Sequence, residues 1–347
     1  MSTVEVNTIE VIVASRRRRR LRRWALLVLL TTLVVIAFAV SLMVGHTFYS
    51  LSEVWRVLSG ETVPGASFTV GDLRLPRATM GLVSGAAFGM AGVTFQTMLR
   101  NPLASPDIIG ISSGASAAAV IAIVMFSLTE AQTSMLAVTA ALATAALIYL
   151  LSFQDGVVGA RLILIGIGIA AMLDSVVSYV ILRASAWDLQ TAMRWLTGSL
   201  NGATWSGVVP VVVAAAIAVP VLLSQSRNLE MLRLGDDVAS ALGVGVERTR
   251  IVVIVAAVAL IAFATAASGP IAFVAFLSGP IAARVFGPGD SLLMPAALVG
   301  ALLVLVADVS GQWAFGTRYP VGVVTGALGA PYLVYLLIRT NRTGGSL

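Results

Sequence analysis

Long apolar stretches, separated by short polar segments, run along almost the whole chain. A helix that crosses a bilayer needs about 20 predominantly apolar residues, because the hydrocarbon core is about 30 Å thick and each residue adds about 1.5 Å. Ten stretches approach this length, at residues 24–44, 77–99, 111–128, 133–153, 162–182, 206–223, 251–268, 270–286, 291–310 and 321–338. The pattern therefore predicts an all-α, polytopic membrane protein with about ten transmembrane helices.

The division of residues 251–286 into two helices is open. Gly269-Pro270 and Gly279-Pro280 interrupt this stretch, and a proline removes one hydrogen bond from a helix. One bent helix or a re-entrant segment would fit the pattern as well as two separate spans.

The distribution of arginines predicts the orientation of the chain. With the N-terminus inside, 16 of the 22 arginines fall in inner segments and six in outer ones, an arrangement that the positive-inside rule favours. We expect a helical domain over residues 24–338 in a bacterial plasma membrane, with a basic tail (1–23) and a C-terminal tail (339–347) both in the cytoplasm. A twin-arginine export signal at Ser15-Arg16-Arg17 is the competing interpretation. The span that follows is too long for a signal peptide, and no A-x-A-like cleavage site comes after it.

Composition narrows the classes of function. Hydrophobic residues make up 58% of the chain and charged residues 11%, whereas soluble domains carry about 25% charged residues. The net charge of +6 comes from seven arginines between Arg16 and Arg23, so it marks a local patch and gives no argument for nucleic acid. The chain has no cysteine, one histidine (His46) and no lysine. This argues against resident zinc, iron-sulfur or haem centres, and any ATP must bind to another chain because the phosphate-binding loop needs lysine.

No arrangement of residues resembles a catalytic triad or a paired-carboxylate active site, so we expect a non-catalytic subunit without a cofactor or a metal. Two carboxylates, Asp174 and Asp308, nevertheless fall within predicted spans. Acids inside a membrane are costly and indicate function by default. Asp174 could relay protons or contact a cargo, and either side chain could instead form hydrogen bonds to a neighbouring helix.

Two further segments suggest contacts between helices or chains. Gly81, Gly85 and Gly89 lie four residues apart, which lets another backbone approach one helix face; packing within the bundle is the favoured interpretation over a moving subunit contact. In the inner loop 224–250, Asp236 is expected to cap a short helix that stops at Gly243. Such a helix is too short to be stable alone, and its apolar face, formed by Val238, Ala241 and Leu242, could pack on its own bundle or on a cytoplasmic protein.

Several motifs occur in order along the chain. They are Arg74-Leu75-Pro76-Arg77, Gln96, Arg100-Asn101-Pro102-Leu103-Ala104, Arg194-Trp195-Leu196-Thr197-Gly198-Ser199-Leu200, the segment from Gly269 to Arg284, and Pro320-Val321-Gly322-Val323-Val324-Thr325-Gly326. Together they resemble the FecCD-type permeases of ATP-driven importers for iron-siderophores, haem and cobalamin, over nearly the whole chain beyond residue 70. The chain departs from that family where it has Gly279-Pro280 instead of a Pro-His pair, and Arg318-Tyr319-Pro320 instead of Glu-Leu-Pro.

The resemblance implies the fold of a type II ABC importer permease. It implies that the chain forms half of a translocation pathway for ferric siderophores, together with an identical or paralogous second permease in the lipid membrane. Two ABC ATPase chains would dock inside and an extracytoplasmic siderophore-binding protein outside. The residues implicated in coupling to the ATPase are Gly235, Asp236, Val238, Ala239, Leu242 and Gly243, those in docking of the binding protein are Arg74, Arg77 and Arg318, and Asp174 is a candidate for the pathway.

A stand-alone, proton-coupled secondary transporter that uses Asp174 and Asp308 is the alternative. The two hypotheses differ in what they require. An importer permease co-purifies with nucleotide-binding chains, whereas a secondary transporter moves its substrate along a pH gradient without them.

Overall fold

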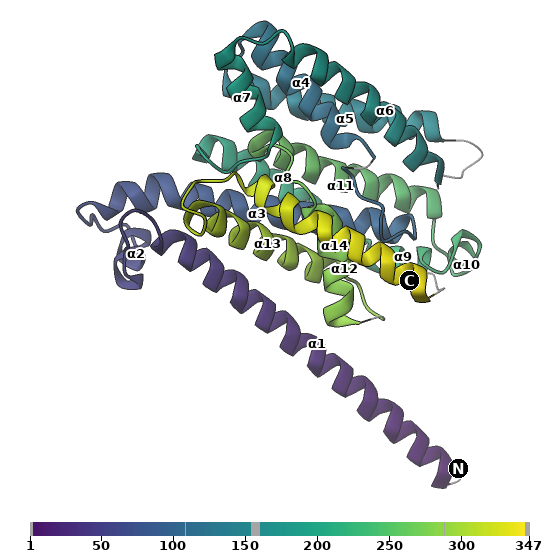
Figure 1. Ribbon diagram of the computed structural model, residues 1–347. Helices are drawn as coiled ribbons and strands as arrows, with labels where there is room; N and C mark the ends of the chain where they lie inside the picture. The colour runs from purple at the N-terminus through teal and green to yellow at the C-terminus, as the bar shows by residue number, and fades with distance from the viewer. Residues whose placement is uncertain (1–2, 108, 154–159, 288, 344–347) are drawn as a thin grey trace.

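The computed structural model describes residues 3–107, 109–153, 160–287 and 289–343 and has helices but no β-strand within them. In chain order the elements are α1 (Thr3–Met43), α2 (Leu51–Leu58), the π-helix η1 (Ser67–Arg74), α3 (Leu75–Met98), α4 (Ile111–Phe126), α5 (Glu130–Ser152), α6 (Ala160–Ile181), α7 (Ala186–Leu196), α8 (Trp205–Ser224), α9 (Ser226–Leu232), α10 (Asp236–Ala241), α11 (Val246–Ser268), α12 (Val274–Phe286), α13 (Leu293–Trp313) and α14 (Val321–Thr343) (Figure 1).

Each of the ten predicted spans falls on one helix, namely α1, α3, α4, α5, α6, α8, α11, α12, α13 and α14. Among the described residues, seven helices are long and apolar enough to cross a membrane by themselves. The apolar parts of α4, α12 and α14 are shorter, at Ile111–Phe126, Val274–Phe286 and Val321–Tyr335. The prediction of an all-α, multi-pass membrane protein is confirmed.

Helix α3 forms the centre of the bundle and packs against α1, α8, α11, α12 and α13. Its closest neighbour is α13, because glycines face each other across the contact. A Cβ atom on Gly85 would lie 2.5 Å from the carbonyl oxygen of Gly300, and one on Gly89 would collide with the carbonyl oxygen of Ala296. The glycine stripe therefore serves packing within the bundle, as expected.

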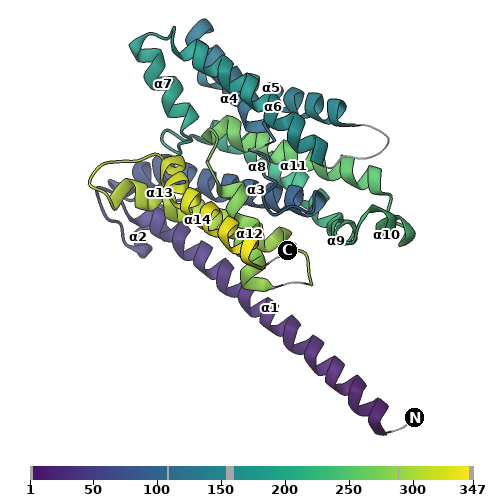
Figure 2. The same cartoon turned by 45° about the vertical axis from the view of Figure 1, so that its right-hand side comes forward.

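A second group of helices stands beside this centre. Helix α4 packs against α5, α6 and α7, and α11 contacts both α4 and α5 on one side and α3 and α8 on the other. Figures 1 and 2 show α11 running between the two groups. Both views also show the two termini lying toward the same end of the bundle as α9 and α10, which we term the α10 end; α2 and α7 lie toward the opposite, α2 end.

The stretch 251–286 forms two separate helices, as two of the ten predicted spans have it, and not one bent helix. Helix α11 ends at Ser268, and Gly269 and Phe273 have positive φ angles of 69° and 63° before α12 begins. A glycine is required at the first of these positions, because a Cβ atom on Gly269 would overlap the carbonyl oxygen of Trp195. Pro280 stays inside α12, whose 13 residues span only about 20 Å.

Candidate functional site

The short helix α10 begins differently from the prediction. Gly235 occupies the cap position with φ 107°, a backbone conformation that glycine adopts without strain. Asp236 is the first helical residue, and no side chain caps the helix. The prediction that Asp236 caps α10 is therefore wrong, because its carboxylate is bonded to an arginine of another helix.

That arginine is Arg250, in the first turns of α11. Its Nη2 donates to both carboxylate oxygens of Asp236, at 2.7 Å and 2.8 Å. The Arg250 side chain is buried, whereas Asp236 is one-third exposed. Arg100, from the loop between α3 and α4, brings its own Nη2 to 3.9 Å from Asp236. One carboxylate thus connects α10 to α11 and to the end of α3.

The apolar residues of α10 divide between two environments. Ala239 is fully buried against the bundle, whereas Val238 and Leu242 are 46% and 56% exposed. Leu234, which precedes the helix, is 63% exposed as well. One side of the segment is therefore anchored to its own chain, and the other presents aliphatic side chains that no described residue covers. We term Leu234, Val238 and Leu242 the α10 face.

At the α2 end, Arg74 is bound to its own chain. Its Nη1 donates to the carbonyl oxygens of Leu42 and Met43, at 2.8 Å and 2.9 Å, and its Nη2 donates to that of Thr47 at 2.6 Å. The guanidinium also lies over the ring of Tyr49, 4.9 Å from its centroid. Arg74 therefore caps the C-terminal end of α1, where carbonyl groups have no partner within the helix.

Arg77 also has partners within the chain. It forms a two-nitrogen ion pair with Asp308 of α13, and its Nη1 donates to Oδ1 of Asn201 at 2.5 Å. Gln312 donates from Nε2 to the same aspartate at 3.0 Å. Asp308 is 2% exposed, so this cluster satisfies a buried carboxylate and joins α3, α13 and the loop before α8.

Arg318 is the most accessible of the three predicted docking arginines. Its guanidinium lies over the ring of Trp313, 5.6 Å from the centroid, and its Nη2 donates to Nε2 of His46. The ring of His46 meets that of Trp313 edge-on. Arg318 and His46 are both exposed, so the three side chains form a small cationic and aromatic group on the surface of the α2 end.

Asp174 lies on the exposed side of α6, where its carboxylate has no hydrogen-bond or ionic partner among the described residues. The part of the chain that the structure describes contains no group of three His, Cys, Asp or Glu side chains that could hold a metal ion. Asp174 therefore stands alone on a helix face that is open to lipid, to a second chain or to a pathway between chains.

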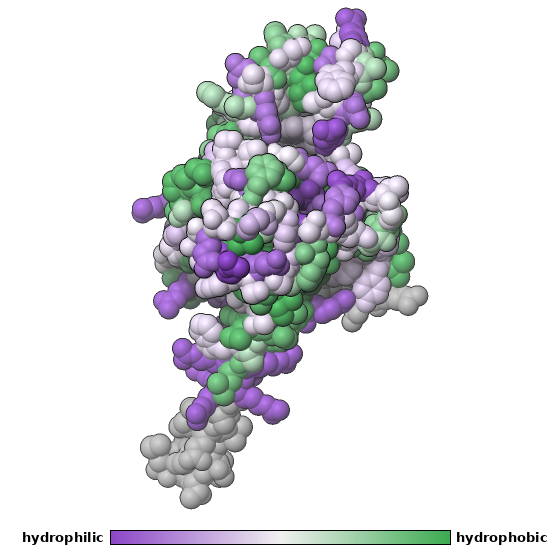
Figure 3. All heavy atoms as spheres, turned by 90° about the vertical axis from the view of Figure 1, so that its left-hand side faces the viewer, coloured by the Kyte–Doolittle hydropathy of each residue, from purple (hydrophilic) through white to green (hydrophobic). Residues whose placement is uncertain are grey.

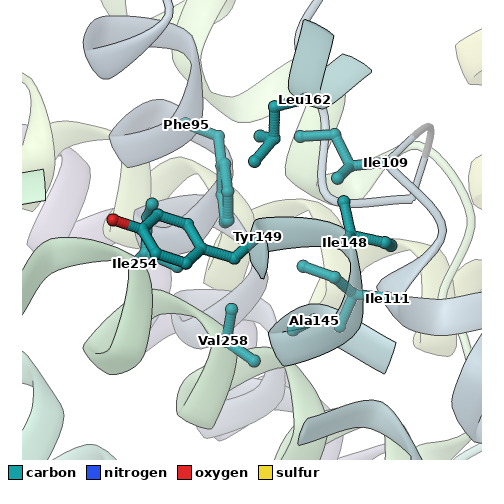
Figure 4. Close-up of a pocket in the computed structure, with 9 residues that line it drawn as sticks. All are labelled: Phe95, Ile109, Ile111, Ala145, Ile148, Tyr149, Leu162, Ile254 and Val258. Carbon is teal, nitrogen blue, oxygen red and sulfur yellow. The ribbon is translucent and has the colours of Figure 1, made fainter. Parts of the chain in front are cut away.

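A pocket between α3, α5 and α11 has an almost entirely apolar lining (Figure 4). It is lined by Phe95, Ile109, Ile111, Ala145, Ile148, Tyr149, Leu162, Ile254 and Val258. The hydroxyl of Tyr149 is the single side-chain oxygen in this set. One hydrogen-bonding group is too few to orient a polar ligand, so we regard the pocket as a packing gap between the two helix groups.

Near the α10 end, Asp107 lies in the loop between α3 and α4. Burial raises the pKa of its carboxyl above the ordinary value of 3.8, and the hydroxyl of Ser112, which donates to Oδ1 at 2.7 Å, acts in the opposite direction. Neither this bond nor the roles of Arg100, Arg250 and Asn201 could be predicted from the sequence. Arg100 and Asn201 contact residues far away along the chain, and Arg250 contacts Asp236 in the preceding short helix, 14 positions away, so no helical period indicates these contacts.

Comparisons with known proteins cover most of the chain. The sequence model of the FecCD transport family matches residues 33–339. The ferric enterobactin transport system permease protein FepG of Escherichia coli (strain K12) is 41% identical over 312 residues, which are 89% of this chain and 94% of that protein. The achromobactin transport system permease protein CbrC of Dickeya dadantii (strain 3937) is 38% identical over 310 residues, 88% of this chain and 89% of that one.

The fold is similar to that of a solved structure described as an inward-facing conformation of a metal-chelate type ABC transporter. The TM-score is 0.81 at 29% sequence identity, and the superposition covers 91% of this chain and 99% of the other.

Proposed function

The chain belongs to the FecCD transport family, and we propose that it is the transmembrane permease subunit of an ATP-driven importer for ferric siderophores. In this proposal it forms half of the translocation pathway with a second permease, and ATP is hydrolysed on separate chains. The observation that carries the proposal is the α10 face. The exposed aliphatic surface of this helix is suited to bind an ATPase chain. Because the helix is also bonded to its own bundle, it can transmit a movement of the ATPase to the transmembrane helices.

We assign the α10 end to the cytoplasm, since most arginines lie toward it in the predicted topology. The residues proposed for coupling then divide by role. Leu234, Val238 and Leu242 contact the ATPase, and Ala239 and Asp236 hold the helix to the bundle. Gly235 and Gly243, with φ angles of 107° and 85°, form the turns at either end.

At the opposite end we propose that Arg318 is the residue that meets the binding protein directly. Its guanidinium is exposed and basic, which suits an acidic partner surface. Arg74 and Arg77 contribute by holding the ends of α1, α3 and α13 in place. Asp174, on the open side of α6, is proposed to line the pathway between two permeases.

The secondary-transporter hypothesis has less support. It needs carboxylates that exchange protons during the cycle, and Asp308 is held in a buried ion pair with Arg77. Asp174 alone would remain for proton coupling. We therefore retain the ATP-driven importer as the proposed function.

The test uses the chain reconstituted in liposomes with its ATPase and binding-protein partners. Leu242→Asp should abolish stable binding of the ATPase and reduce siderophore uptake at least tenfold, because a charge would have to be buried at the interface. Leu58→Asp is the matched control: Leu58 is 45% exposed at the α2 end, and its replacement should leave ATPase binding unchanged. Normal binding and uptake by Leu242→Asp would overturn the coupling role, and uptake driven by a pH gradient without ATPase chains would overturn the importer.

A further inference from the structure

We propose that six arginines of α1 bind the phosphate groups of anionic phospholipids. The six, Arg16 to Arg20 and Arg22, are here termed the arginine collar. All six are exposed, and none forms an ion pair or a side-chain hydrogen bond with another described residue. Their neighbour Arg23 differs, since it pairs with Asp290 at 2.8 Å and donates to the carbonyl oxygen of Ser291 at 2.6 Å. The collar therefore begins where α1 leaves the bundle.

The arrangement of the collar around the helix favours a ligand that surrounds it. Successive residues of an α-helix are about 100° apart, so five consecutive arginines point in all directions around the axis. Figure 3 shows hydrophilic side chains projecting on both sides of the stem that α1 forms below the main body. A partner protein would contact one side of such a stem. The headgroup layer of a membrane surrounds a helix that passes through it.

The position of the arginine collar along α1 places it at the level of the lipid headgroups. Residues 24–43 of α1 span about 30 Å, which is the thickness of the hydrocarbon core. Trp24, at the inner boundary, is 58% exposed, as is typical of tryptophans at the level of the headgroups. The collar occupies about 10 Å directly beyond Trp24, where the phosphates of the lipids lie.

Both ends of the apolar segment are fixed, so the collar cannot slide out of this layer. Arg74 holds the carbonyl groups of Leu42 and Met43 at one end, and the Arg23–Asp290 pair holds the other. A guanidinium presents two parallel N–H donors to a phosphate. The anionic headgroups of a membrane present such phosphate acceptors on all sides of a helix at this depth, whereas no described residue bonds to the collar. The inference rests on the membrane-spanning fold and does not depend on the cargo.

The experiment uses the purified full-length chain in neutral detergent, where the direction of membrane insertion plays no part. Phosphatidylglycerol is titrated into the micelles, and the lipid retained by the protein is measured by native mass spectrometry. Arg17, Arg18 and Arg19 are replaced together by glutamine, which preserves helix propensity. The matched control replaces three exposed arginines of the α9–α11 region, Arg227, Arg233 and Arg248, in the same way.

We expect the collar variant to retain at least fivefold less phosphatidylglycerol than the parent and the control. Lysine at the same three positions should restore binding, and added salt should weaken it. Phosphatidylcholine should bind equally to all variants, and inorganic phosphate should not displace the lipid. Equal retention of phosphatidylglycerol by the collar variant and the parent would overturn the proposal.

Discussion

The carboxylate of Asp308 accepts hydrogen bonds from two nitrogens of Arg77, Nε at 2.9 Å and Nη2 at 2.8 Å. The two residues are 231 positions apart, and the bond joins the first turn of α3 to α13 near its C-terminal end. Asn201 and Gln312 complete the cluster. The α2 end of the bundle is thus held together by a polar cluster around a carboxylate that is 2% exposed.

Removing one partner of this pair should destabilise the protein strongly. Arg77→Gln leaves the Asp308 carboxylate buried without its cation, and breaking a buried pair in this way costs about 3–5 kcal/mol. We expect a clear loss of thermal stability in detergent, measured by the melting of the purified chain. Arg194→Gln is the control, since Arg194 is exposed. Equal melting temperatures for the two variants would show that the pair does not hold the bundle together.

The contact between α3 and α13 should not tolerate a side chain. A Cβ atom on Gly85 would be pressed against the backbone of Gly300, so Gly85→Ala should cost about 1–3 kcal/mol of stability through overpacking. Gly168→Ala in α6 is the matched control, because no atom lies within 4 Å of its added Cβ. It should be neutral or stabilising by up to about 1 kcal/mol, since alanine favours the helix. If Gly85→Ala melts like Gly168→Ala, the helices can separate at no cost.

Asp236 should matter for the coupling of ATP hydrolysis to transport. Asp236→Asn weakens the bond to Arg250 that ties α10 to α11, while the α10 face stays intact. We expect normal ATPase binding with transport per hydrolysed ATP lowered on the order of tenfold. The neighbouring Asp237 is exposed, so Asp237→Asn should behave like the parent. Asp236→Glu should restore part of the transport per hydrolysed ATP that Asp236→Asn loses. An unchanged ratio in Asp236→Asn would exclude the bond from force transmission.

The stability of the α3–α4 loop should depend on pH through Asp107. Its pKa is raised by burial, so the folded state holds this proton more tightly than the unfolded state does. The stability that the protonated form provides is complete below the ordinary value and is lost as the pH rises through the folded pKa. Asp107→Asn does not titrate there. The melting temperature of Asp107→Asn should therefore increase relative to that of the parent as the pH rises. A difference between the two melting temperatures that stays constant at every pH would contradict the prediction.

The positions of the ten main helices could be predicted from the sequence, because a helix that crosses a bilayer needs a long apolar stretch. Such a stretch is recognisable by its hydropathy alone, without knowledge of its neighbours in the fold. The extension of α1 through the arginines could not, since hydropathy gives no signal for a polar helix. The same holds for α2, α7 and α9, which are short. The division at Gly269 was left open because proline and glycine permit a bend or a break, and only the close approach to Trp195 decides between them.

The residues of the candidate site could be predicted from the sequence, but their hydrogen bonds and ion pairs could not. The face with Val238 and Leu242 follows from helical spacing, and both side chains are exposed. The predicted capping role of Asp236 was wrong, because a carboxylate at the start of a helix is typical of a cap, and its bond to Arg250 of the next helix leaves no signal in the sequence. Arg77 looked like a surface residue for the same reason: its motif says nothing about Asp308.

The bonds from Arg74 to the end of α1 have a consequence for the order in which the protein is made. Leu42 and Met43 are synthesised 32 and 31 residues before Arg74, so the last carbonyl groups of the first long helix are made before their donor exists. Those groups gain their donor only when Arg74, the last residue of η1 and the one that precedes α3, lies beside them. The first helix to be synthesised is thus completed by the second to cross.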